Sequence, residues 1–146
     1  MSNKATSADH HHLITVETVV NKPMNHIWEK WTLPEHIMKW NNASDDWYTP
    51  AAENELRAGG SFSYTMSAKD GSFSFDFSGI YDEVNLNRSI AYTLGDDRKV
   101  VIKFIEATEG VRIIETFEAE DSNSLEMQKS GWQAILDNFK RYVEND

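Results

Sequence analysis

The side chains that could carry acid–base chemistry are spread along the chain rather than gathered in a recognisable motif. They are two histidines and four carboxylates, His26, His36, Asp45, Asp46, Asp76 and Glu83. A general base must reach its proton at hydrogen-bonding distance, and the sequence spacing establishes no such pair. Nucleophile, zinc-protease and phosphate-loop signatures are also missing from the sequence. We therefore assign no catalytic residue, no metal ligand and no cofactor, and we expect both histidines to be exposed.

Glu83 is the strongest single candidate for a polar residue of a site. It follows the alternating phase of Tyr81, which we expect to point inward. An inward carboxylate costs free energy unless it is paired, and Arg112 or Tyr92 could be its partner. Asp76 falls in the opposite phase and is interpreted as a solvated strand residue.

An aromatic face gives the second kind of chemistry, the binding of an apolar ligand. In the segment SFSYTMSAKDGSFSFDFSGIY, aromatic residues and Met66 alternate with serine, threonine and aspartate on both sides of the hairpin signal Asp70-Gly71. Apolar walls with a few polar groups are typical of small-molecule sites. The predicted cavity lining is Trp40, Phe62, Tyr64, Met66, Phe73, Phe75, Phe77, Tyr81, Glu83, Tyr92, Trp132 and Leu136. The alternative is ordinary core packing, in which these aromatic rings fill the space themselves.

The elements that must position these residues follow from the hydrophobic periodicity. The pattern predicts a strand over residues 13–20, a helix after Pro23, and a second short helix over residues 34–40. A short strand over residues 47–49, ending before Pro50, and then a run of antiparallel strands joined by tight turns come next. The fold class is therefore α+β.

The last predicted element is a helix from Ser124 to Glu144, with Ser124 as its N-cap. A helix of this length spans roughly 30 Å, enough to cross a small domain. Trp132 lies on its apolar stripe. Gly131 costs about 1 kcal/mol inside a helix relative to alanine, so we expect the helix to pack closely against the sheet there.

Bulk properties limit the possible functions. The chain has 146 residues, no cysteine and a formal net charge of −10. We expect residues 1–12 to be a flexible leader and residues 13–146 to form one domain. The absence of cysteine excludes disulfides and thiolate sites. The negative charge argues against nucleic-acid binding, and no segment predicts a membrane span or a signal peptide, so we expect a cytoplasmic protein.

The segment from Glu106 to Glu126 is strongly acidic and contains Arg112 as its one basic residue. Such a run predicts a solvated face of the domain. The alternative is a docking surface for a basic partner.

Several segments, taken in order, resemble a known family. They are HIWEKWTLPEHIMKWN, GGSFSY, GIYDEVN and GWQAILDNFKRYVE, within a similarity that extends over about residues 13–144. Together they resemble the domain of activators of the heat-shock-protein-90 ATPase. That family is part of the START-like (SRPBCC) superfamily, which includes polyketide cyclases and the birch-pollen-allergen type.

The resemblance implies a helix-grip fold, in which a curved antiparallel sheet of six to seven strands wraps around a long C-terminal helix. Two short helices follow the first strand, and many members have a cavity between sheet and helix. We expect a domain that binds a small apolar or aromatic molecule. The alternatives are a protein-interaction domain that modulates a chaperone ATPase and an enzyme of the cyclase or hydrolase type that uses Glu83. The sequence does not specify the ligand or the oligomeric state.

Overall fold

The computed structural model describes residues 12–145, so most of the leader predicted for residues 1–12 lies outside the described residues. The chain begins with β1 (Leu13–Val20), which is followed by the short helices α1 (Met24–Thr32) and α2 (Pro34–Trp40). Six strands come next, and the chain closes with helix α3 (Leu125–Glu144). The strands are β2 (Trp47–Asn54), β3 (Ser61–Ala68), β4 (Ser74–Asn85), β5 (Ser89–Leu94), β6 (Lys99–Ala107) and β7 (Gly110–Glu118).

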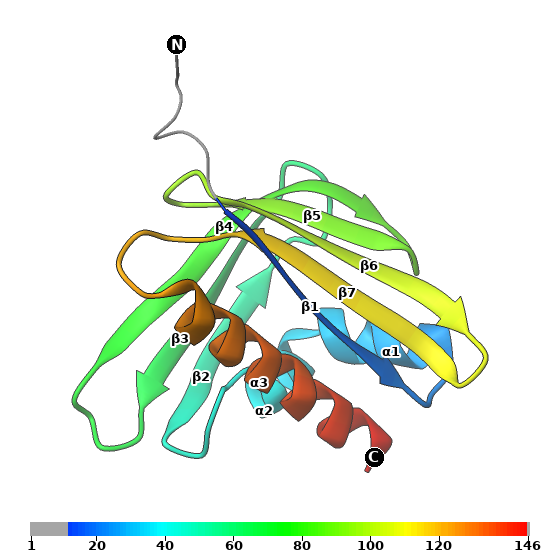
Figure 1. The fold of residues 1–146 in the computed structure, drawn as a ribbon, viewed down its shortest axis with the longest axis horizontal. Coiled ribbons are helices and arrows are strands. Elements are labelled where there is room, and N and C mark those ends of the chain that lie inside the picture. The colour runs from blue at the N-terminus through cyan, green and yellow to red at the C-terminus, as the bar shows by residue number, and fades with distance from the viewer. Residues whose placement is uncertain (1–11, 146) are drawn as a thin grey trace.

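The strands form one antiparallel sheet in the order β1-β7-β6-β5-β4-β3-β2. The sheet curls around α3, with α1 and α2 at one end of the hollow (Figure 1). The predicted helix-grip fold, with its α+β class and its two short helices after the first strand, is confirmed. Among the described residues, no helix is long and apolar enough to span a lipid bilayer.

The closing helix begins as its sequence predicts. The Ser124 side chain accepts a hydrogen bond from the Met127 backbone N–H at 3.0 Å, which satisfies one of the free donors at the helix start. Leu136, Phe139 and Val143 form the fully buried stripe that faces the sheet and the short helices.

The two short helices are held to α3 by aromatic rings. Trp31 and Trp40 lie 4.9 Å apart between ring centroids, and each contacts Phe139 at 4.8 to 4.9 Å. The Trp40 indole N–H donates to the Lys30 carbonyl at 2.9 Å, which ties α2 to α1. These contacts place the end of α2 next to the interior of the curved sheet.

Strand β2 is longer than predicted. We expected a strand over residues 47–49 ending before Pro50, but β2 continues to Asn54. Its register shifts between Tyr48 and Ala51, around Pro50. Since β2 is an edge strand and proline lacks a donor, a bulge at an edge is where a proline can be accommodated.

Candidate functional site: an aromatic cavity with one carboxylate

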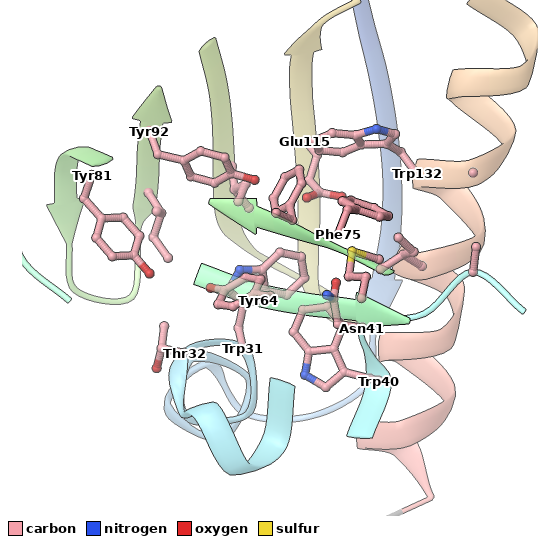
Figure 2. Close-up of a pocket in the computed structure, with 17 residues that line it drawn as sticks. Trp31, Thr32, Trp40, Asn41, Tyr64, Phe75, Tyr81, Tyr92, Glu115 and Trp132 are labelled. Carbon is pink, nitrogen blue, oxygen red and sulfur yellow. The ribbon is translucent and has the colours of Figure 1, made fainter. Parts of the chain in front are cut away.

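A cavity of about 250 Å³ lies between the concave face of the sheet, α3 and the two short helices. Figure 2 shows side chains from all three regions around the same space. Ala43 and Phe75 are its exposed lining residues and mark its mouth. The lining consists of Trp31, Thr32, Trp40, Asn41, Ala43, Tyr64, Met66, Phe75, Phe77, Tyr81, Ile90, Tyr92, Ile102, Glu115, Gly131, Trp132 and Ile135.

The period of the strands explains why most of these side chains meet. The inward-pointing residues are Tyr64 and Met66 on β3 and Phe75 and Phe77 on β4. Tyr64 pairs with Phe77 across the two strands, and Met66 pairs with Phe75. In β5 and β6 the same phase carries Ile90, Tyr92 and Ile102. Successive strand side chains point to opposite faces, so the period-two pattern directs every second residue to the concave face.

Helix α3 provides the opposite wall. The Trp132 ring lies 6.0 Å from Phe77 across the cavity, measured between ring centroids, with the two planes at 72°. On its other side, Trp132 is stacked on Phe117 of β7 at 3.9 Å. Trp132 therefore belongs both to the packing between helix and sheet and to the cavity wall.

Three tyrosines bring hydroxyl groups to the lining. Burial raises the pKa of Tyr64 and of Tyr92 well above the usual value, and it also raises the pKa of Tyr81. The Asn54 side-chain amide donates to the Tyr81 hydroxyl at 3.3 Å and to the Thr32 carbonyl at 2.9 Å, which links β2 to α1 and β4. At neutral pH these phenols are protonated and can donate or accept hydrogen bonds.

Within residues 12–145, Glu115 is the one carboxylate in the lining. It projects from β7 into the cavity, and only 6% of its surface is exposed (Figure 2). Among the described residues, nothing donates a hydrogen bond to its carboxylate or forms an ion pair with it. Burial raises the pKa of Glu115 to about 8 because the charged form loses its hydration. A negative charge on Glu115 also raises the pKa of Tyr92, so the two groups interact.

Most of the predicted lining residues surround this cavity: Trp40, Tyr64, Met66, Phe75, Phe77, Tyr81, Tyr92 and Trp132. Two others lie in the core behind it. Phe62 is buried among Tyr64, Phe77, Tyr81 and Tyr92, and Leu136 is fully buried on α3. The Phe62 ring occupies space left by Gly79, where a Cβ atom would approach the ring to 3.1 Å.

Phe73 does not point into the cavity. It precedes the first residue of β4, is 59% exposed, and lies against Trp47 with ring centroids 6.2 Å apart. The alternation of phenylalanines suggested one continuous strand, but the turn at Asp70-Gly71 extends past Phe73. The prediction that Phe73 lines the cavity is wrong.

The inward orientation predicted for Glu83 is also wrong. The register of β4 against β5 shifts between Tyr81 and Glu83, so Glu83 pairs with Ala91 and is exposed, while Val84 pairs with the buried Ile90. A bulge adds one residue to a strand and reverses the phase beyond it. The suggested partner Arg112 instead pairs with Glu17 at 2.8 Å.

Sequence reasoning missed Glu115, which it assigned to the solvated acidic run. A signal for it exists in the segment VRIIETF, because Glu115 shares its phase with Val111, Ile113 and Phe117. All four are buried in the structure, so part of the predicted solvated face is interior. Trp31, which is not among the predicted lining residues, lies both in the core and in the lining.

The curved sheet, the closing helix and the cavity between them define a START-like helix-grip domain, a fold that commonly binds hydrophobic ligands. Residues 21–144 match the model of the family described as "Activator of Hsp90 ATPase homolog 1-like protein", and the chain belongs to that family. No curated protein matches the chain significantly.

Solved structures agree with this assignment. An AHSA1-like protein from Aeromonas hydrophila is 40% identical, with a TM-score of 0.86 and 92% of this chain and 93% of that chain covered. A protein from Cytophaga hutchinsonii is 53% identical, with a TM-score of 0.79 and 90% and 92% covered. A protein from Nitrosomonas europaea shares the fold at 18% identity, with a TM-score of 0.77 and 91% and 94% covered.

Proposed function

We propose that this domain binds a small, mainly aromatic molecule in the cavity between the sheet and α3. The observation that carries the proposal is the lining itself, in which aromatic rings from three strands, both short helices and α3 face one space. Burial of apolar ligand surface against such walls is the main source of affinity in small-molecule sites.

The size of the cavity limits the ligand. Sites for drug-sized ligands typically measure about 300–1,000 Å³, and this cavity measures about 250 Å³. A ligand with one or two fused rings and a short substituent suits it, whereas a sterol or a long acyl chain requires the walls to move. The cavity opens to solvent beside the exposed side chains of Ala43 and Phe75, and such a molecule can enter there.

The proposal is tested by calorimetric titration with 3-propylindole, a neutral aromatic probe of this size. We expect saturable binding with a negative heat-capacity change, the signature of buried apolar surface. The matched control is Gly131→Leu, because the position of the missing Cβ atom of Gly131 has open space around it and borders the cavity. We expect this variant to lose at least about tenfold in affinity. Absence of binding to the wild type, or equal affinity in the variant, contradicts the proposal.

A further inference from the structure

The ionisable groups that the described residues contribute to the cavity wall are acidic, and none is basic. Among the residues that the structure describes, the cavity lining includes the carboxylate of Glu115 and the hydroxyl groups of tyrosines, but no lysine, arginine or histidine. Glu115 is more than nine-tenths buried and points into the cavity, and no described residue is its hydrogen-bond or ion-pair partner. A buried carboxylate without a partner is rare because its desolvation is costly, and such a group commonly marks a site of function.

Among the described residues, the titratable groups that share the cavity lining with Glu115 do not neutralise its charge. Tyr92 on β5, Tyr81 on β4 and Tyr64 on β3 are protonated phenols at neutral pH. Helix α3 contributes Gly131, Trp132 and Ile135 to the lining, none of which titrates. In the free protein the charge of Glu115 is therefore removed by a proton.

The surroundings of Glu115 also favour a positive charge on a ligand. Three aromatic rings share the lining with Glu115: Phe77 and Tyr92, whose ring centroids lie 6.3 Å apart on the same sheet, and Trp132 on α3. The faces of aromatic rings attract cations, most strongly where water is excluded. The formal net charge of −10 adds a long-range attraction for cations.

We propose that Glu115 binds the ammonium group of a small aromatic amine whose ring occupies the aromatic part of the cavity. This inference rests on the proposed function, since it names the chemical class of ligand for the same site. The carboxylate supplies the counter-ion and hydrogen-bond acceptor for the ammonium group, and the ammonium group replaces the proton that neutralises Glu115 in the free protein.

Replacement of the Glu115 proton by the ammonium group releases a proton to solvent, and the number of protons released on binding can be measured. The ligand enters as R–NH3⁺ and keeps its three protons, while the Glu115 carboxyl group ionises and its proton passes to solvent. Because the pKa of Glu115 is about 8 in the free protein, binding at pH 7 releases close to one proton. Affinity for the amine rises with pH up to about 8 and then levels off until the amine itself loses its charge.

The experiment compares tryptamine with 3-propylindole, in which a methyl group replaces the ammonium group, by calorimetry at pH 7 in buffers of different ionisation enthalpy. We expect the wild type to prefer tryptamine by roughly 10- to 100-fold, the range for a hydrogen bond to a charged group. Tryptamine binding should release close to one proton, and 3-propylindole binding none. Glu115→Gln should lose both the preference and the proton release, since its amide is close in shape to a protonated carboxyl group.

Glu83→Gln is the matched control, because it removes one negative charge from the exposed face and does not touch the cavity. It should keep the preference and the proton release. Binding of 3-propylindole without any preference for tryptamine overturns the inference on Glu115 and leaves the proposed function standing. Binding of neither probe overturns both. A preference for tryptamine that persists in Glu115→Gln assigns the amine to another group and also overturns the inference.

Discussion

Trp132 of α3 is stacked face to face on Phe117 of β7, with ring centroids 3.9 Å apart and an angle of 12° between the ring planes. The stack joins the closing helix to the strand that lies next to the β1 edge of the curved sheet. Because the Trp132 ring also borders the cavity, the same side chain stabilises the fold and shapes the site.

Replacement of Trp132 by alanine removes this stack and one cavity wall. We expect a loss of about 2–4 kcal/mol in the free energy of unfolding, somewhat less than for a fully buried tryptophan. Trp132→Phe keeps an aromatic ring against Phe117 and should lose less than half of that amount. Urea denaturation followed by circular dichroism measures both variants, and equal losses in the two would show that the stack itself contributes nothing.

Gly131 gives a prediction opposite to the one made from sequence. The glycine within the helix predicted close packing at this position, but the site of its missing Cβ atom has no heavy atom within 4 Å. Gly131→Ala should therefore stabilise the protein by about 1 kcal/mol, the difference in helix propensity. Gly131→Leu should also fold without overpacking, because its side chain enters the cavity. A fall in melting temperature for Gly131→Ala would restore the close-packing interpretation.

Glu115 makes the stability of the domain depend on pH. Its pKa is 4.5 in an unperturbed chain and about 8 in the folded protein, so the folded state holds a proton that the unfolded state releases between these values. Stability contributed by this group therefore falls as pH rises from about 4.5 to about 8, and is constant above that range. At pH 7 the raised pKa of Glu115 lowers the free energy of unfolding by roughly 3 kcal/mol.

Glu115→Gln removes this penalty. We expect the difference in unfolding free energy between variant and wild type to move in favour of the variant as pH rises from 5 to 8. Parallel urea titrations at several pH values measure the difference. A difference that stays constant over this range means that Glu115 titrates normally in the folded protein.

Asn138 of α3 holds the loop that follows α2, near the mouth of the cavity. Its side-chain amide donates to the Trp40 carbonyl at 2.8 Å and to the Asn42 side-chain oxygen at 3.2 Å. Asn138→Ala removes both bonds, although the Trp40 carbonyl keeps the Asn42 backbone N–H as a donor at 2.8 Å, and should cost about 1 kcal/mol. Faster amide hydrogen exchange at Asn41 and Asn42 should accompany the loss, whereas exchange in β6 should change only as much as global stability does. Unchanged exchange at the loop would contradict this role.

Local patterns predicted the parts of the fold that repeat regularly. Ser124 and the apolar stripe through Leu136 and Phe139 predicted α3, and the alternating aromatics predicted the β3–β4 hairpin. These predictions succeeded because a hydrophobic period of two or 3.6 residues determines which side chains face the interior.

The errors arose where the backbone departs from a regular period. The bulge after Tyr81 turned Glu83 outward, and the turn before β4 left Phe73 exposed. Glu115 was missed for a different reason, since its charge outweighed its phase in the interpretation of the acidic segment. A carboxylate within an otherwise apolar phase is a signal of function rather than of solvent exposure.

The five tryptophans offer the most direct test of the cavity, because each indole N–H gives its own nuclear magnetic resonance signal. Trp31, Trp40 and Trp132 line the cavity, whereas Trp28 and Trp47 do not. On titration of ¹⁵N-labelled protein with 3-propylindole, we predict saturable shifts at the three lining tryptophans and much smaller shifts at the other two. Shifts confined to Trp28 and Trp47, or no shifts at all, would contradict a ligand site between the sheet and α3.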